Sequence, residues 1–193
     1  IGFIRPHLPC SVPKKYWDLY DINQIPLPAF EISPEDAPSF AVKRGGEINN
    51  FKPIDPFRVL PYEEDLKRNL IHGYYASISF MDKQLGRVMR EVKNLGLDEN
   101  TIIVLWGDHG WHLGDHGLWI KHTNFEQAVS SPMIIYSPDH GLENNKTSSP
   151  VELLDIYPTL CDLAGISIPN EVEGKSIKEV MIDPGHKLSL IHI

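Results

Sequence analysis

A long helical pattern, followed by an apolar run and a glycine-rich loop, most constrains the fold of this chain. Apolar residues recur in steps of three and four over residues 62–95, which predicts one long amphipathic helix. The apolar run Thr101–Trp106 comes next and predicts a buried strand. A second apolar run at residues 132–136 predicts another buried strand, and residues 151–163 predict a second amphipathic helix. This alternation predicts an α/β fold with a mainly parallel sheet flanked by helices.

Prolines concentrate in the first third of the chain. Ten of the sixteen fall within residues 1–61. Each proline fixes one backbone angle and removes a hydrogen-bond donor, so we expect residues 10–61 to form a long loop that walls a functional site. Short helices are predicted at Lys14–Leu19 and at residues 124–131.

The two ends of the sequence suggest part of a longer protein. The chain begins with Ile1, and residues 1–4 resemble the end of a strand, so we expect an interior fragment whose localisation signal lies elsewhere. Residues 183–193 fit no predicted element and form an unassigned tail, native or not.

Composition excludes several classes of protein. The 193 residues are 41% hydrophobic and 23% charged, as in globular domains, and carry a net charge of −8. That charge argues against a nucleic-acid binder, and no apolar run approaches the ~18 to 20 residues that cross a bilayer. The two cysteines form no CxxC pair, and the sequence lacks a P-loop, a GxGxxG, a Gly-x-Ser-x-Gly and an HExxH.

The loop Gly107–Gly117 follows the first strand and holds four glycines, two aspartates and three histidines. Ligands bind beyond the carboxyl ends of strands in open α/β sheets, and such a polar cluster is costly without a counter-charge. Asp108 and His109 are therefore candidate ligands of a divalent metal ion, which would need further ligands from elsewhere. The alternative is a turn cap at Asp108 and a hydrogen-bonded structural histidine at His109.

Two further residues could serve an anionic substrate. Lys121 lies on the same loop system and could bind an anionic oxygen as a point charge. His7 lies between prolines and could donate a proton to a leaving group. Each could instead be an ordinary surface residue. His112, His116 and His122 are ambiguous, and some of them could orient metal ligands.

Four segments, in order, resemble the sulfatase family of the alkaline-phosphatase-like superfamily, nearest to its iduronate-2-sulfatase branch. The resemblance spans residues 1 to about 182, which we interpret as part of a sulfatase catalytic domain. The segments that carry it are Gly2-Phe-Ile-Arg-Pro-His-Leu-Pro9, Tyr74-Tyr-Ala-Ser-Ile-Ser-Phe-Met-Asp82 with Gly86, Gly107-Asp-His-Gly-Trp-His-Leu-Gly-Asp-His-Gly-Leu-Trp-Ile-Lys121, and Leu154-Asp-Ile-Tyr-Pro-Thr-Leu160 with Ala164-Gly-Ile166.

The resemblance implies roles for the candidate residues. Asp108 and His109 would bind the active-site calcium; calcium prefers oxygen ligands, so Asp108 is the firmer of the two and His109 could be only its neighbour. Lys121 would contact the sulfate, and His7 would contact the substrate and assist departure of the sugar oxygen. The family's nucleophile is a formylglycine made from a C/S-x-P-x-R motif, and neither Cys10 nor Cys161 lies in one. It would lie upstream of residue 1, so we expect this chain alone to be inactive.

Three functions remain open at this stage. The resemblance favours a sulfuric ester hydrolase acting on a sulfated saccharide, exported in a bacterium or lysosomal in an animal. A phosphonate monoester or phosphodiester hydrolase of the same superfamily is the second hypothesis. A non-catalytic binder of sulfated glycans is the third. None of them requires a nucleic-acid partner or a membrane span.

Overall fold

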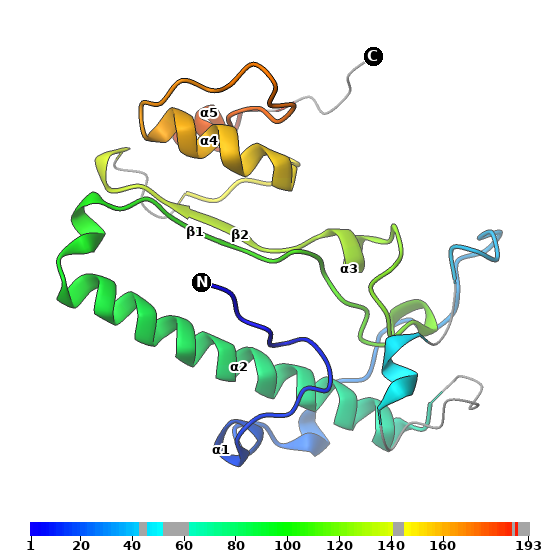
Figure 1. Ribbon diagram of the computed structural model, residues 1–193. Helices are drawn as coiled ribbons and strands as arrows, with labels where there is room; N and C mark the ends of the chain where they lie inside the picture. Colours follow the sequence, from blue (N-terminus) through cyan, green and yellow to red (C-terminus); the bar gives the residue numbers. More distant parts are fainter. Residues whose placement is uncertain (43–45, 52–61, 141–144, 187, 189–193) are drawn as a thin grey trace. The chain divides into compact units, whose positions relative to one another are not determined.

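The chain forms two compact units in the computed structural model, which describes residues 1–42, 46–51, 62–140, 145–186 and 188 (Figure 1). The first unit contains Ile1–Glu91 and His109–Ser131, and the second contains Val92–Asp108 and Pro132–Ile193.

The predicted long helix is confirmed as α2, Glu64–Asn94 (Figure 1). Glu64 and Asp65 lie in its first turn, where their charge complements the positive end of the helix dipole. Two residues beyond the helix, Gly96 adopts the left-handed conformation with φ 65° and donates its N–H to the Lys93 carbonyl at 3.0 Å. No described helix is both long and apolar enough to cross a membrane.

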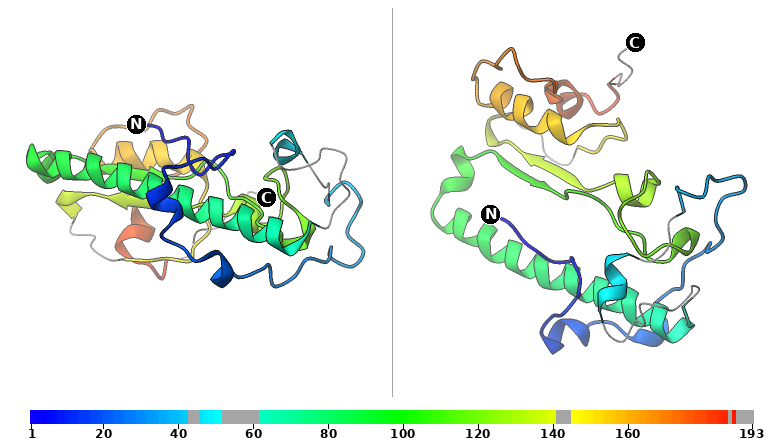
Figure 2. Two further views of the ribbon diagram at one scale, coloured as in Figure 1. Left: turned by 90° about the horizontal axis from the view of Figure 1, so that it is seen from below. Right: turned by 45° about the vertical axis from the view of Figure 1, so that its right-hand side comes forward.

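The short helix α1, Lys14–Trp17, lies beside α2 in the views of Figures 1 and 2. It ends two residues before the predicted boundary. The Trp17 ring contacts that of His72, with centroids 4.2 Å apart, and His72 donates its Nε2–H to the Trp17 carbonyl at 2.8 Å. Tyr20, just beyond α1, shares a 2.6 Å hydrogen bond with Ser79. These contacts explain why polar residues lie on the buried side of α2.

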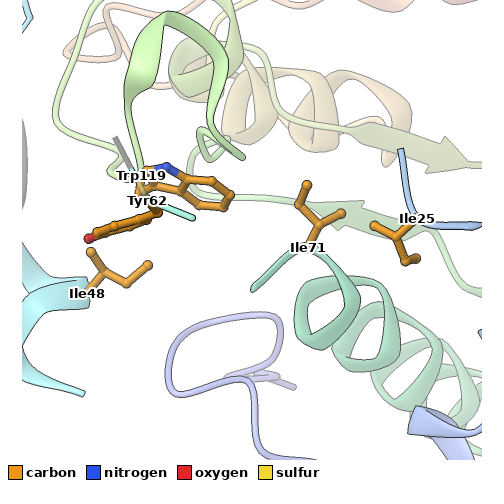
Figure 3. Close-up of a cluster of buried hydrophobic side chains, with 5 residues drawn as sticks. All are labelled: Ile25, Ile48, Tyr62, Ile71 and Trp119. Atoms are coloured by element: carbon orange, nitrogen blue, oxygen red, sulfur yellow. The ribbon is translucent and has the colours of Figure 1, made fainter. Parts of the chain in front are cut away.

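The hydrophobic core of the first unit draws on four separate segments (Figure 3). Its buried members are Ile25, Ile48, Tyr62, Ile71 and Trp119. Figure 3 shows the Tyr62 ring beside that of Trp119, and their centroids lie 5.9 Å apart. Burying large aromatic and branched side chains stabilises by about 1.5–3 kcal/mol each, so this cluster fixes the loops relative to α2.

The proline-rich region is largely irregular where the structure describes it, as predicted. Besides α1 it contains two 3₁₀ turns, η1 at Ile22–Gln24 and η2 at Glu47–Asn50. The loop prediction for residues 43–45 and 52–61 lies outside the described residues. Glu31 of this region forms a 2.6 Å ion pair with Lys67, which is buried on α2. That pair compensates the cost of burying the lysine ammonium.

The second unit contains a two-stranded sheet, and this corrects part of the prediction. Strands β1, Ile103–Trp106, and β2, Met133–Tyr136, pair antiparallel with Ile103 opposite Tyr136. We expected parallel, buried strands. The intervening chain contains only the 3₁₀ turn η4 (Asp115–Gly117) and the four-residue helix α3 (Glu126–Val129), and no long helix of the kind that usually connects parallel strands. Neither strand is buried: every residue of both strands is half-exposed or exposed.

A helical layer completes the second unit. The predicted helix at residues 151–163 is observed as a 3₁₀ turn, η6 (Leu153–Asp155), that continues into α4 (Ile156–Leu163). The buried Asp155 carboxylate accepts the N–H groups of Glu152 and Lys175 at 3.0 and 2.9 Å. Sequence analysis missed α5, Lys178–Ile182, and the 3₁₀ turns η3 (Leu97–Asn100) and η5 (Pro138–His140). In the unassigned tail, residues 183–186 and 188 are described and contain no helix or strand.

Candidate active site

His7 lies in a tight turn that its own backbone and a neighbouring guanidinium hold. The His7 N–H donates to the Ile4 carbonyl at 2.9 Å, and the Arg5 guanidinium donates to the His7 carbonyl at 2.9 Å and to the Ser11 carbonyl at 3.1 Å. The turn therefore fixes the backbone of His7 while its ring stays accessible, with 39% of the side chain exposed.

Lys121 follows a buried stretch of the glycine-rich loop. Leu118, Trp119 and Ile120 are all buried, and the Ile120 carbonyl accepts the N–H of His112 at 3.0 Å. Trp119 belongs to the hydrophobic core of the unit, so the backbone that leads to Lys121 is held in place. Its side chain is only 15% exposed.

The buried side chain of His112 connects two parts of this loop by hydrogen bonds. Its imidazole is fully buried, bonded at Nδ1 to the Asp115 carboxylate and at Nε2 to the Thr123 hydroxyl, the latter at 2.8 Å. Burial raises the pKa of Asp115, but the hydrogen bond and charge of His112 outweigh it, and the net pKa of that carboxyl is lowered. The contact with Thr123 restrains the backbone two residues from Lys121, whereas the hypothesis that His112 orients a metal ligand stays a prediction.

The structure brings together the two residues expected to serve the substrate. Lys121 Nζ lies 3.1 Å from His7 Nε2, although 114 positions separate them in sequence. His7 Nδ1 lies 3.0 Å from the Leu8 carbonyl, which can only accept, so Nδ1 carries a proton. In the neutral ring Nε2 then has the lone pair, and the Lys121 ammonium donates to it.

Glu47 joins the same cluster, and sequence analysis did not single it out. Its carboxylate oxygens lie 3.4 Å from His7 Nε2 and 3.6 Å from Lys121 Nζ. An acidic residue in a proline-rich loop carries no local signal that would reveal a histidine and a lysine so distant in sequence as its neighbours. The cluster as a whole can bind an anion and exchange a proton beside it.

The two candidate metal ligands follow the strand directly. Asp108 is exposed and is the last residue of the first segment of the second unit, whereas His109 begins the second segment of the first unit. His109 donates its Nδ1–H to the Gly110 carbonyl at 2.7 Å, the arrangement that fixes a ligating histidine to use Nε2. The described residues contain no group of three or more His, Cys, Asp or Glu side chains that could hold a metal. The role of Asp108 and His109 as metal ligands stays a prediction.

Comparison with known proteins decides the family. The family model described as Sulfatase matches residues 1–166 of the 193. The chain belongs to the sulfatase family.

Curated relatives support the same assignment. A protein named Sulfatase from Formosa agariphila is 37% identical over 94% of this chain and 35% of its own length. The iduronate 2-sulfatase of Mus musculus is 31% identical over 88% of this chain and 36% of its own length. This sulfatase chain therefore spans about a third of the curated relatives it matches.

Solved structures confirm the predicted α/β, alkaline-phosphatase-like fold class. The phosphonate monoester hydrolase of Agrobacterium radiobacter matches with a TM-score of 0.78 and 26% identity, over 97% of this chain and 38% of that one. A structure described in complex with its substrate D-glucosamine-2-N,6-O-disulfate matches with a TM-score of 0.54 and 28% identity, over 66% of this chain and 27% of that one.

The remaining candidates in this sulfatase chain, His116, His122 and Cys10, lie in different surroundings. The ring of His116 stacks on Phe125 with centroids 4.5 Å apart, and its backbone N–H donates to the Phe30 carbonyl at 3.0 Å. His122 is exposed. Cys10 is half-buried, and burial raises the pKa of its thiol, which disfavours the thiolate that a nucleophile needs.

Proposed function

We propose that the complete protein is a sulfuric ester hydrolase that removes sulfate from a sulfated saccharide. The observation that carries this proposal is the 3.1 Å approach of Lys121 Nζ to His7 Nε2. A cation and an imidazole at one point can serve the two ends of a sulfate ester bond, the sulfuryl oxygens and the leaving oxygen.

The two side chains have different tasks in this proposal. Lys121 binds a sulfuryl oxygen and stabilises the negative charge that redistributes in the transition state. His7 protonates the departing sugar oxygen, which is a poor leaving group without an acid. The low exposure of Lys121 strengthens its attraction for the anion, because less water screens the charge.

Asp108 and His109 are proposed to hold a calcium ion together with ligands from the rest of the protein. The carboxylate suits calcium, and the imidazole is the less usual partner. A bound divalent cation there supplies Lewis-acid stabilisation of the sulfate group.

Names of relatives support the saccharide as substrate class. One similar protein is an iduronate 2-sulfatase, and one similar structure is described with a disulfated glucosamine as its substrate. On the same family likeness we propose that the complete protein is exported from a bacterial cell, or lysosomal in an animal cell.

A phosphonate monoester or phosphodiester hydrolase is the second candidate. The specific observation in its favour is the fold similarity to a phosphonate monoester hydrolase, with a TM-score of 0.78. In that case Lys121 would bind a phosphoryl oxygen and His7 would protonate the leaving group, as proposed for the sulfate ester.

One experiment separates these candidates. The complete protein is assayed with the sulfate, phenylphosphonate and phosphodiester of one phenol, alongside His7→Ala and Lys121→Ala. We expect the highest kcat/KM on the sulfate, and a loss of about 100-fold or more in Lys121→Ala. The loss in His7→Ala should be smaller on a phenol ester and should reach that size on a sulfated monosaccharide, whose alkoxide needs an acid to leave. The control Lys14→Ala removes an exposed lysine paired with Asp18 and is expected to leave activity intact. Preference for the phosphorus esters would favour the second candidate, and binding of sulfated glycan without turnover would favour the non-catalytic binder.

A further inference from the structure

Glu47 occupies a position that the roles of His7 and Lys121 leave unexplained. Its carboxylate faces the same two atoms that are proposed to meet the substrate, His7 Nε2 at 3.4 Å and Lys121 Nζ at 3.6 Å. One-third of its side chain is exposed, so the carboxylate lies partly open to solvent beside the pair.

The turn that carries Glu47 is built into the core. The next residue, Ile48, is 1% exposed and packs in the cluster that includes Trp119 (Figure 3). Asn49 accepts a 3.1 Å hydrogen bond from the Tyr62 hydroxyl. Gly46 has φ 113°, and a Cβ there would lie 3.1 Å from the Ile120 side chain. The turn is therefore docked directly against the residue that precedes Lys121.

To act as an acid, His7 must carry protons on both ring nitrogens, and a nearby carboxylate can stabilise that charged form. Nδ1–H is held by the Leu8 carbonyl, so the ring can donate from Nε2 only when both nitrogens are protonated. The Lys121 ammonium, 3.1 Å from Nε2, repels such an imidazolium. The Arg5 guanidinium adds positive charge on the backbone side, where it binds the His7 carbonyl. Among these neighbours of His7, Glu47 alone is negative.

We propose that Glu47 is a positioning residue that stabilises the imidazolium of His7 between two cations, and so keeps it able to protonate the leaving oxygen. This inference rests on the proposed sulfatase function. The Nε2–H bond breaks and an O–H bond forms as the S–O ester bond gives its electron pair to the departing oxygen, while the sulfuryl group passes to the oxygen nucleophile that ester hydrolysis requires. The neutral ring then accepts a hydrogen bond from Lys121, and water restores its proton.

Leaving-group dependence tests the proposal in the complete protein. Glu47→Gln keeps the size of the side chain and removes its charge. The kcat of this variant is compared with that of the wild type on 4-nitrophenyl sulfate, whose phenolate leaves without an acid, and on a sulfated monosaccharide, whose alkoxide does not. We expect the loss on the saccharide sulfate to exceed the loss on the aryl sulfate by about 10- to 100-fold. Glu47→Asp, which restores the charge, is expected to recover part of that difference.

The control and the contrary outcomes are well defined. Glu31→Gln removes a carboxylate from the structural pair with Lys67 and is expected to leave the ratio between the two substrates unchanged. Because the ratio is measured within one preparation, it does not depend on the fraction of folded protein. Equal losses on both substrates would overturn the proposal, as would a lower KM with faster turnover of both, which would mean that Glu47 merely occupies the place of the anion. If the wild type hydrolyses neither sulfate, the proposed function itself fails, and this inference with it.

Discussion

At the scale of single residues, His112 shows how a buried polar side chain can hold together the loop that carries a candidate site residue. Its two ring nitrogens bind Asp115 and Thr123, which lie on either side of the buried segment that leads to Lys121. Both nitrogens are thus hydrogen-bonded, which is the condition for burying an imidazole at low cost. From the sequence, His112 was an ambiguous histidine; the structure shows that it is buried and bonded to Asp115 and Thr123.

The charge of Asp115 gives a pH-dependent prediction. Its pKa is lower in the folded protein than in the unfolded chain, so it stabilises the fold above the unfolded pKa of about 3.9 and ceases to do so as the pH falls through the folded value. Asp115→Asn should therefore lower the free energy of unfolding of the complete protein at pH 7. The gap to the wild type should close progressively below about pH 4, as urea titrations at several pH values would measure. A gap independent of pH would contradict this, and Asp82→Asn on the exposed side of α2 serves as the control.

For the catalytic candidates, the sequence and the tertiary structure supply different information. His7 and Lys121 could be singled out one at a time, from a proline frame and from a loop. Their 3.1 Å approach and the presence of Glu47 depend on the packing of three distant segments around Ile48 and Trp119.

At the scale of elements, locally encoded structure was predicted best. Helix α2 has a regular apolar period and an acidic first turn, so its bounds differ from the prediction by only a few residues. The strands were located but not correctly paired, because pairing depends on the route of the chain between them, and an apolar run does not report it. Helix α5 has five residues, too short for a periodic pattern to reveal.

Two glycines give opposite predictions for the same substitution. A Cβ at Gly110 would clash with the Gln127 carbonyl oxygen of α3, so Gly110→Ala should destabilise by about 2 kcal/mol or more and displace the neighbouring His109. A Cβ at Gly86 meets nothing within 4 Å, so Gly86→Ala should stabilise α2 by about 0.5–1 kcal/mol. Thermal unfolding of the two variants of the complete protein measures both signs. Equal effects would show that backbone contact at Gly110 is not limiting.

At the scale of the whole molecule, the candidate metal site is the least complete feature. Asp108 and His109 adjoin the strand, but the described residues assemble no set of three ligands around them. The family relatives are about three times longer than the part matched by this chain, so the proposed calcium site is a property of the complete protein.

Calcium linkage tests that site without relying on turnover. An ion that binds only the folded state stabilises it by about 2.7 kcal/mol at 100 times its Kd. Calcium added to the chelator-treated complete protein should therefore raise its Tm, and Asp108→Ala should abolish most of the rise. Asp82→Ala, an exposed carboxylate on α2, should retain it. A full calcium response in Asp108→Ala would remove this residue from the site.

The sequence by itself determined the family, the long helix, and the separate candidates His7, Asp108, His109 and Lys121, because each is carried by a local motif or a regular period. Tertiary structure alone decided that His7 meets Lys121, that the Glu47 carboxylate faces both of them, and that β1 and β2 run antiparallel. The physical reason is the same in each case. Contacts between distant segments arise when apolar side chains such as Ile48 and Trp119 are buried together, and no local pattern encodes which polar neighbours they bring with them.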